Sequence, residues 1–388
     1  METSFNKLYS KKIILKDFLE NRLSIESKRR AMNDSHAKRF PRPCGLTIHS
    51  AVGCNLNCVY CYVPEIFGIN YMVPYGLSGE ELILALLSNK YFFPTIYGTY
   101  LAFGSITEPF HPIASLKTFE YLYFIDKYLG NPVQFSTKFF LRKDQINLFK
   151  KYRNLSLSPL VTLISIKYAS ILEPNAPKPE KRLELIRSLR KAGFKPFIFY
   201  RPLIPYKVFE EAENVLREAK KAGAIGVIIG GFRITERIIM NLKKIGFTIK
   251  AKFPKDFKGQ YSLHLRKYKD SLVKISREIG LIPFKSACCA NTYSILLNKG
   301  LRIPCGNLCF QKNFCTNCPV DCKNIPVNVE MDDVKNAFKK IMNIEPDRID
   351  IQRNVINTFI KRKLSGKRRR EVVIIERIFR KKINIIYH

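Results

Sequence analysis

The chain has 388 residues, 46% of them hydrophobic, so it is long enough for one large core and a smaller appended module. No apolar run reaches the length of a membrane span and the first residues lack a secretory pattern, so we expect a cytoplasmic protein. The 67 Lys and Arg against 32 Asp and Glu give a net charge of +35, which favours an anionic partner such as nucleic acid over a merely basic surface.

The first 43 residues are basic and mixed, and we expect a helix followed by an extended arm. Clusters such as Lys28-Arg29-Arg30 are typical of a solvated face, although an arm at the mouth of a barrel could also contact phosphates. An alternating run at 45–51 then predicts a strand, which Gly53 ends.

Three thiols follow this strand within eight residues, at Cys54, Cys58 and Cys61. Eleven cysteines in a cytoplasmic chain favour metal ligation over disulfides. A structural zinc site needs four protein ligands, and here Cys44 or His49 would have to supply the fourth. An iron–sulfur cluster held by three thiolates instead leaves one iron open to a small molecule.

The spacing C-x3-C-x2-C, with Tyr60 before the last cysteine, resembles the radical SAM superfamily. This resemblance implies that the three thiolates hold a [4Fe–4S] cluster and that the open iron binds S-adenosylmethionine, whose reductive cleavage gives a 5′-deoxyadenosyl radical. It also implies that Tyr60 lies against the adenosyl moiety. An electron donor such as ferredoxin or flavodoxin is a further implied partner.

Strand and helix patterns alternate from residue 44 to about 250. We expect strands at 45–51, 99–104, 133–137, 160–166, 196–201 and 225–230, and helices at 80–89, 115–129, 142–152, 180–192, 207–222 and 234–245. Three of these helices end in cations followed by glycine, at Gly193, Gly223 and Gly246. Six such units predict an α/β fold with a parallel sheet, in agreement with the partial (β/α)6 TIM-type barrel of the radical SAM core.

Motifs at the strand ends resemble one branch of the superfamily, the spore photoproduct lyase-like group. They are Thr107-Glu108-Pro109-Phe110-His111-Pro112, Thr137-Lys138 with Arg142-Lys143-Asp144, Glu173-Pro174-Asn175-Ala176-Pro177, and Pro202-Leu203-Ile204-Pro205. The resemblance implies that Thr107 and Glu108 approach the amino group of S-adenosylmethionine and that Lys138 pairs with its carboxylate. It implies further that Ser165 reaches the ribose hydroxyls and that Arg201 contacts substrate or cofactor.

The chain departs from this branch in two places. Glu108 and His111 replace the usual Asp and Gln, and we expect a structural role for His111 rather than proton transfer. The lyase carries a hydrogen-donating cysteine on its second strand, whereas residues 102–108 contain none. The resemblance therefore covers cofactor use well and thymine-dimer repair poorly.

A second cysteine-rich segment follows a predicted basic helix at 263–279. Cys288 and Cys289 are adjacent, and five further thiols form the run C-x3-C-x5-C-x2-C-x3-C: Cys305, Cys309, Cys315, Cys318 and Cys322. These five are candidate ligands of a second metal centre, either an auxiliary [4Fe–4S] cluster or a structural zinc ion.

The last segment has a predicted helix at 331–342 and then basic runs at 361–363, 367–370 and 380–382, which suit a docking helix or a nucleic-acid-binding arm. We divide the chain into a basic arm (1–43), a radical SAM core (44–260), a helix with a cysteine-rich metal module (261–325) and a basic helical tail (326–388). The favoured function is a radical SAM enzyme that repairs or modifies nucleic acid. The alternatives are a radical SAM enzyme that modifies peptides and a zinc-stapled, non-enzymatic nucleic-acid-binding protein.

Overall fold

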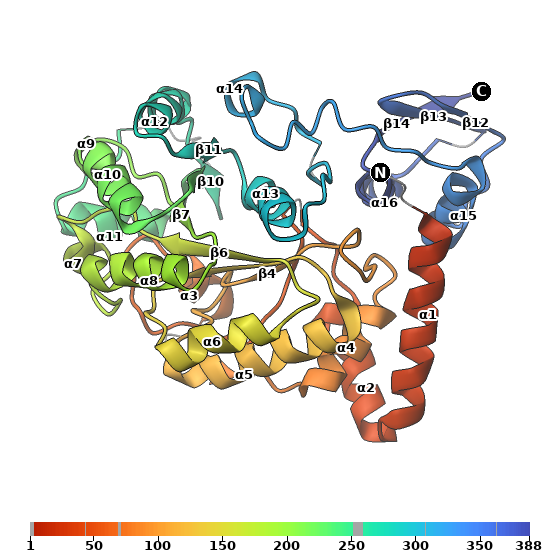
Figure 1. The fold of residues 1–388 in the computed structure, drawn as a ribbon, viewed down its shortest axis with the longest axis horizontal. Helices are drawn as coiled ribbons and strands as arrows, with labels where there is room; N and C mark the ends of the chain where they lie inside the picture. Colours follow the sequence, from red (N-terminus) through yellow and green to blue (C-terminus); the bar gives the residue numbers. More distant parts are fainter. Residues whose placement is uncertain (1–3, 43, 69–70, 251–258, 307, 362) are drawn as a thin grey trace.

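A parallel sheet organises the computed structural model, which describes residues 4–42, 44–68, 71–250, 259–306, 308–361 and 363–388 (Figure 1). All neighbouring strands of this sheet are parallel. Their order is β1 (Leu46–Thr47), β4 (Leu101–Phe103), β5 (Val133–Thr137), β6 (Leu157–Thr162), β7 (Phe197–Tyr200), β8 (Gly226–Ile229) and β11 (Ile282–Phe284). The expected α/β class and parallel sheet are confirmed, with seven strands instead of six.

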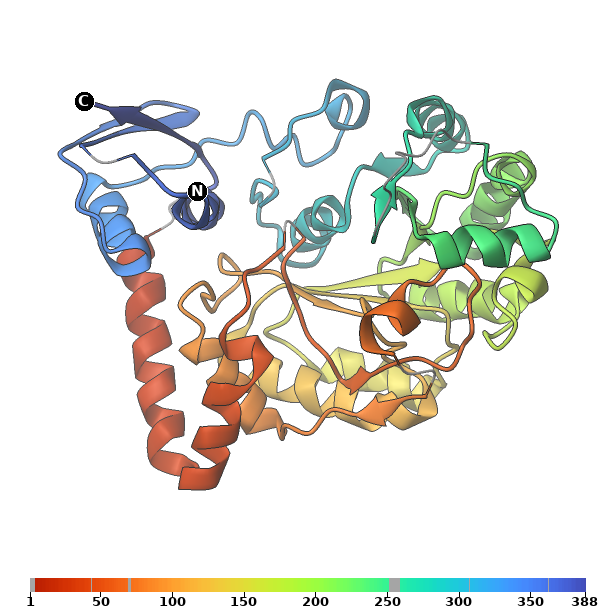
Figure 2. The ribbon, with the colours of Figure 1, turned by 180° about the vertical axis from the view of Figure 1, so that it is seen from behind.

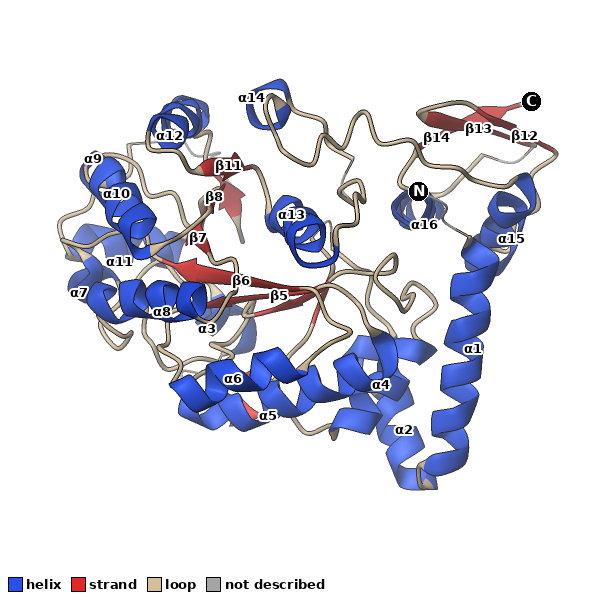
Figure 3. Cartoon of the chain, in the orientation of Figure 1, coloured by secondary structure: helices blue, strands red, loops and turns tan. Residues whose placement is uncertain are grey.

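Amphipathic helices cover the outer face of this sheet (Figure 3). They are α4 (Gly79–Ser88), α5 (Pro112–Phe124), α6 (Lys143–Lys151), α8 (Pro179–Lys191), α10 (Ala212–Ala222), α11 (Glu236–Lys244) and α12 (Arg266–Glu278). The three glycines expected to end helices have left-handed φ angles of +94° at Gly193, +107° at Gly223 and +81° at Gly246. Only a residue without Cβ takes such angles cheaply, which explains why the helices end there.

The seventh strand corrects the expected strand count. The basic helix predicted at 263–279 is α12, which packs against β8 and β11 and leads through Gly280 (φ +77°) into β11. There Ile282 pairs with Gly226 of β8. Three residues containing a proline are too short to show a strand period, so the sequence pattern missed this strand.

Helix α13 (Ala287–Lys299) lies against the inner face of the sheet and was not predicted. Its buried polar side chains bond to strand residues: the hydroxyls of Tyr100 and Thr292 are 2.9 Å apart, and Asn291 Nδ2 donates to Gln134 Oε1 at 2.9 Å. The short helix α14 (Lys312–Cys315) follows in the cysteine-rich segment. Helix α13 therefore fills the concave side of the sheet and delimits the space left for a ligand.

The tail corrects a second expectation, because it is not only helical. It contains α15 (Met331–Met342), β12 (Arg348–Ile351), β13 (Val355–Ile360), α16 (Gly366–Phe379) and β14 (Lys382–Tyr387), and the three strands form a separate sheet. The reason lies in β13, where Ile356, Thr358 and Ile360 are buried and alternate with half-buried neighbours, as one strand face requires. Figure 2 shows this unit beside the barrel.

The arm also differs from expectation, since it forms two helices, α1 (Phe5–Arg22) and α2 (Ile25–Asn33). Helix α1 reaches the C-terminal unit, where Asn6 N donates to Asp333 Oδ1 at 2.9 Å and Phe5 packs in that unit's core. Among the described residues, no helix is long and apolar enough to cross a membrane. The remaining short elements are η1 (Ser35–Ala37), β2 (Ala51–Val52), α3 (Val63–Phe67), β3 (Val73–Pro74), η2 (Ile125–Leu129), α7 (Ala169–Leu172), α9 (Lys207–Glu210), β9 (Arg233–Ile234) and β10 (Tyr261–Ser262).

Candidate active site

The three-thiol loop begins directly after β2. Gly53 has a φ of +82°, which turns the backbone just before Cys54. Cys54, Cys58 and Cys61 all line one cavity of about 430 Å³ on the concave side of the sheet, which we call the inner cavity. Burial raises the pKa of each of these thiols, that of Cys58 to about 12, so in the absence of a metal they are protonated.

The chain segment that follows α7 holds this loop by its backbone. Val59 N donates to Leu172 O at 3.0 Å, and Asn175 N donates to Leu56 O at 3.3 Å. The Asn175 side chain adds a bond from Nδ2 to Asn55 O at 2.9 Å. A loop without regular secondary structure lacks the repeated backbone hydrogen bonds of a helix or sheet, so these three bonds fix its path.

Tyr60 is anchored by a buried ion pair. Its hydroxyl donates to Glu173, which also pairs with Arg182, and the side chains of Glu173 and Arg182 are each only 1% exposed. Arg182 uses its remaining donors on Thr162 O (3.2 Å) and Pro177 O (2.9 Å). The motif beginning at Glu173 thus supports the thiol loop from beneath, and it leaves the Tyr60 ring on the wall of the inner cavity.

Lys138 ends β5 and lines the same cavity, with Nζ 6.0 Å from the centre of the Tyr60 ring. Burial alone would lower the pKa of Lys138, but the Cys58 thiolate that forms at high pH, together with the carboxylates of Glu173 and Glu108, outweighs burial and raises that pKa. The ammonium group therefore stays charged inside the cavity. A cation at this place can pair with a carboxylate of a bound ligand.

Thr107 and Glu108 also reach the inner cavity, but their polar groups differ in how they are used. Glu108 is fully engaged: Thr137 Oγ1 donates to it, and Lys138 N donates to Oε2 at 3.0 Å, while burial raises its pKa. The Thr107 hydroxyl is buried and has no hydrogen-bond partner among the described residues. An orphaned hydroxyl on a cavity wall fits a site built to receive a polar ligand.

Ser165 is not brought to this cavity. Its hydroxyl donates to Glu211 and accepts from Tyr168 N at 2.8 Å, and it is absent from the lining of the inner cavity. Arg201 does line the cavity. His111 accepts from Ile113 N at 3.2 Å as the N-cap of α5, which is a structural role as expected.

Positive charge dominates the wall of the inner cavity. Among the described lining residues the only acidic side chain is the buried Glu108, whereas the basic ones are Arg42, Lys138, Arg201, Arg233, Lys269 and Lys285. The pKa of Lys269 is lowered by burial and then by the charges of Lys285 and Arg201, so these cations repel one another. An anionic ligand would relieve that repulsion.

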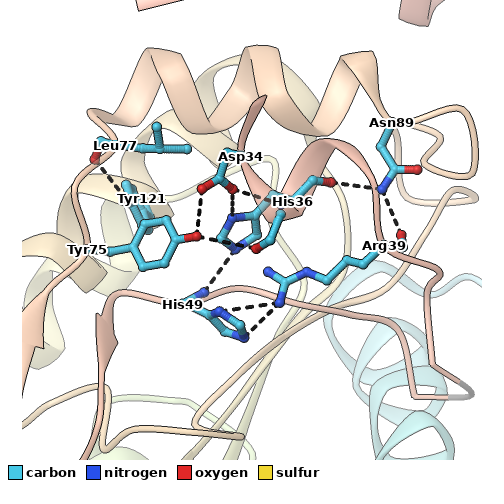
Figure 4. Close-up of polar contacts among 9 residues, drawn as sticks. Asp34, His36, Arg39, His49, Tyr75, Leu77, Asn89 and Tyr121 are labelled. Carbon is cyan, nitrogen blue, oxygen red and sulfur yellow. Dashed lines mark hydrogen bonds and ion pairs between the residues drawn. The ribbon is translucent and has the colours of Figure 1, made fainter. Parts of the chain in front are cut away.

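A polar network joins the N-terminal arm to the segment just before the thiol loop (Figure 4). His36 Nδ1 donates to Asp34 at 2.6 Å, and His36 Nε2 accepts from His49 N at 3.2 Å. Tyr75 donates to the other oxygen of Asp34 at 2.7 Å. The His49 ring lies 2.9 Å from Arg39 Nη1 and does not line the inner cavity, so nothing in this arrangement makes His49 a fourth metal ligand.

The C-terminal thiols meet residues from the core. Cys305 interacts directly with the thiols of Cys309 and Cys322 and with those of Cys288 and Cys289 on α13, and Cys288 in turn interacts with Cys44. Of the five predicted C-terminal ligands, Cys315 and Cys318 stand apart and affect this group only through charge. We call the six interacting thiols the inner thiol group.

No set of three His, Cys, Asp or Glu side chains in the described part of the chain is arranged to hold a single metal ion. Thiolates 2.3 Å from one zinc ion would lie within about 4 Å of one another. Cys54, Cys58 and Cys61 on one cavity wall supply three thiols, which is the donor set of a cluster that keeps one iron open to a small molecule.

Known proteins share these features. Residues 48–219 match the family model described as the Radical SAM superfamily. An uncharacterized protein of Methanocaldococcus jannaschii (MJ0683) is 26% identical over 183 residues, which cover 45% of this chain and 65% of that protein. An uncharacterized protein of Acidianus two-tailed virus (ORF301) is 25% identical over 203 residues, which cover 46% and 64%. The match thus spans slightly less than two thirds of each relative.

Solved structures show the same fold. Spore photoproduct lyase complexed with dinucleoside spore photoproduct matches with a TM-score of 0.51 and 17% identity over 66% of this chain and 83% of that one. A mutant of that lyase with AdoMet and dinucleoside spore photoproduct bound matches with a TM-score of 0.52 and 18% identity over the same shares.

The sheet, the three-thiol loop and the inner cavity together define a radical SAM domain. Residues 48–219 match the Radical SAM family model, and the fold is similar to that of spore photoproduct lyase.

Several site residues escaped the sequence interpretation. The role of Glu173 and Arg182 under Tyr60 has no periodic signal, although both lie in or beside the quoted motif. Lys269 and Lys285 reach the inner cavity from α12 and from the segment after β11, which sequence patterning assigned elsewhere. Cys44 was considered only as a zinc ligand for the first loop, whereas it meets Cys288 instead.

Proposed function

We propose that this chain is a radical SAM enzyme that acts on an anionic substrate, namely nucleic acid. The observation that supports it is the convergence of three thiols, the Lys138 ammonium and the unpartnered Thr107 hydroxyl on one cavity. A [4Fe–4S] cluster held there by Cys54, Cys58 and Cys61 would supply the reductive cleavage of S-adenosylmethionine to a 5′-deoxyadenosyl radical.

The protein's own contribution is to bind and orient. Lys138 would pair with the carboxylate of S-adenosylmethionine, and Thr107 would accept from its amino group. Glu108, which is committed to Thr137 and Lys138, would act by fixing the turn that carries Thr107. Tyr60, anchored by Glu173, would present its ring to the adenosyl moiety. A role for Ser165 at the ribose would require it to leave Glu211.

Nucleic acid is the proposed substrate class because the cavity wall is cationic and the whole chain carries +35. A spore photoproduct lyase of similar fold was solved in complex with dinucleoside spore photoproduct, which supports this choice of substrate class. A peptide substrate would need no such surplus of positive charge.

The test is anaerobic reconstitution with iron and sulfide, followed by reduction in the presence of S-adenosylmethionine. We expect a brown protein with broad absorption near 400 nm that releases 5′-deoxyadenosine, and Cys58→Ser should abolish this release and reduce the absorption. A colourless zinc protein that releases no 5′-deoxyadenosine would overturn the proposal.

The substrate class is tested by salt-dependent binding to single- and double-stranded oligonucleotides. Lys269→Gln/Lys285→Gln should weaken binding and reduce the slope of log K against log salt by about 1–2. The matched control is Lys143→Gln/Lys150→Gln, which removes two exposed charges from α6, away from the cavity. If both pairs behave alike, or if only acidic peptides bind, nucleic acid is not the substrate.

We also propose a second metal centre at the inner thiol group. It is supported by the direct interactions of Cys305 with Cys288, Cys289, Cys309 and Cys322, although these thiols are not arranged around one ion in the described structure. Metal analysis of Cys58→Ser protein, which isolates this centre, should show remaining iron or zinc. That metal should be lost on a further Cys305→Ser change and retained on a further Cys315→Ser change; equal metal content in both would contradict this ligand set.

A further inference from the structure

The thiol loop has a second open side. A cavity of about 350 Å³, which we call the outer cavity, lies between the loop and α11. Cys54, Cys58 and Cys61 line it as well as the inner cavity, whereas Tyr60 lines only the inner one. The other residues of the outer wall are Leu56, Asn57, Val59, Pro64, Arg237, Asn241, Lys244 and Ile245. The loop is therefore a thin wall between two spaces.

Helix α11 presents one polar face to the outer cavity. Arg237, Asn241 and Lys244 are spaced by four and three residues and so share a face, while Ile238 and Leu242 are buried on the opposite side. The helix is tied to the loop region because Thr235, its N-cap, donates to Glu65 of α3 at 2.5 Å. This face is consequently held at a fixed position over the thiols.

The charges on this wall are all positive. Arg237 and Lys244 are the only ionised side chains among the described residues that line the outer cavity, and no described acidic side chain forms an ion pair with either. The outer cavity thus offers a cationic approach to the same thiols.

We propose that the face of α11 made by Arg237, Asn241 and Lys244 is the docking surface for an acidic one-electron donor protein. This inference rests on the proposed function, which requires an electron at the group held by the thiols. The donor would lose one electron and the held group would gain it, with no bond or proton exchanged. Reduction from the outer side leaves the inner cavity free for S-adenosylmethionine and substrate.

Charge complementarity favours this occupant over the others. An anionic nucleic acid would also be attracted, but the outer wall offers only two cations against six around the inner cavity. Among the described residues that line the outer cavity there is no aromatic side chain on which a nucleobase could stack. Acidic electron-transfer proteins reach a cationic patch by electrostatic steering, which affects the association rate most strongly.

The test measures binding of the full chain to an immobilised acidic flavodoxin at 50–300 mM salt. Arg237→Gln/Lys244→Glu should lower affinity tenfold or more at 50 mM salt and flatten its salt dependence. The matched control is Lys243→Glu, an exposed neighbour on α11 that does not line the outer cavity. Lys243→Glu changes the net charge by the same amount as Lys244→Glu, and it should alter the affinity for flavodoxin by less than threefold.

A second measurement separates this inference from the proposed function. With dithionite as reductant, Arg237→Gln/Lys244→Glu should release 5′-deoxyadenosine as the unchanged protein does, whereas flavodoxin-driven release should fall at least tenfold. Equal loss for Lys243→Glu and Lys244→Glu, or unchanged flavodoxin binding in the double variant, would overturn the docking surface. Failure of dithionite-driven release in the unchanged protein would instead overturn the proposed function.

Discussion

The buried pair of Glu173 and Arg182 should control the stability of the thiol loop. Arg182→Met keeps the apolar stem of the side chain but leaves Glu173 as an unpaired buried anion, with only the Tyr60 hydroxyl as a donor. Both side chains are 1% exposed, so solvent cannot compensate. Breaking such a pair from one side costs about 3–5 kcal/mol.

This cost should appear at the loop before it appears in global unfolding. Glu173 binds Tyr60, and the neighbouring Asn175 and Leu172 hold the loop backbone, so a displaced Glu173 frees Cys58 and Cys61. A loss of about 3 kcal/mol in local stability corresponds to roughly a hundredfold rise in the open population. Alkylation of the metal-free protein by iodoacetamide, followed by mass spectrometry, measures that population cysteine by cysteine.

We expect alkylation of Cys58 and Cys61 to accelerate at least tenfold in Arg182→Met, with little change at the buried Cys288. Adding Glu173→Gln removes the unpaired charge and should recover much of the loss. The matched control is Arg217→Met, which breaks an ion pair exposed by 55% and 52% and should cost less than about 1 kcal/mol. Unchanged alkylation in Arg182→Met, or no recovery in the double variant, would refute this reasoning.

Three further predictions follow from other parts of the site. Burial, together with the charge of Arg39, lowers the pKa of His36 to about 4 and that of His49 to about 2, so the unfolded chain binds protons at a higher pH than the folded chain. The contribution of these histidines to the free energy of unfolding should be complete above about pH 6.5 and should fall as the pH decreases toward 4, by roughly 1.4 kcal/mol per pH unit for each histidine. Denaturant titrations should show a shallower slope in His49→Gln. Gly104→Ala should lower the melting temperature by several degrees more than Gly246→Ala, because both glycines have positive φ but only at Gly104 would a Cβ strike Ser136; equal shifts would contradict this. Lys138→Gln should weaken the binding of S-adenosylmethionine about tenfold or more, because it removes a charged contact of about 1.5–3 kcal/mol. Calorimetry of the reconstituted protein measures this change, and Lys143→Gln should leave the affinity unchanged.

Hydrophobic periodicity predicted correctly those helices and strands whose own residues show a clear period. The strand at 133–137 and the helix at 331–342 match the structure residue for residue, because each shows an uninterrupted period and clear boundaries. Helix α13 was missed because it faces the inside of the barrel with polar residues. Asn291, Thr292 and Ser294 are buried there, with Asn291 bonded to Gln134 of β5 and Thr292 to Tyr100 just before β4, and these polar residues interrupt the apolar period.

The sequence predicted those site residues that lie close after a strand along the chain. The thiol loop follows β1 and the short β2, and the turn with Thr107 follows β4. Because β1 and β4 are parallel neighbours, both segments lie at the same edge of the sheet and line the inner cavity. Ser165 failed to reach the inner cavity because β6 ends at Thr162 rather than at 166, and the extra residues carry the hydroxyl away to Glu211. The partners of Cys305 on α13 could not be predicted, since that helix was not.

The thiol loop explains why so much of the chain is arranged around eight residues. The loop lacks the repeated backbone hydrogen bonds of a helix or strand, and it separates two cavities, so no other element packs tightly against either of its faces. Its position is therefore set by the segments around it: by the network from Asp34 to His49 before it, by Glu173 and Asn175 beneath it, and by Glu65 with Thr235 after it. A loop held at both ends and from beneath leaves its thiols open to both cavities, which the proposed binding of a small molecule from one side and the proposed delivery of an electron from the other require.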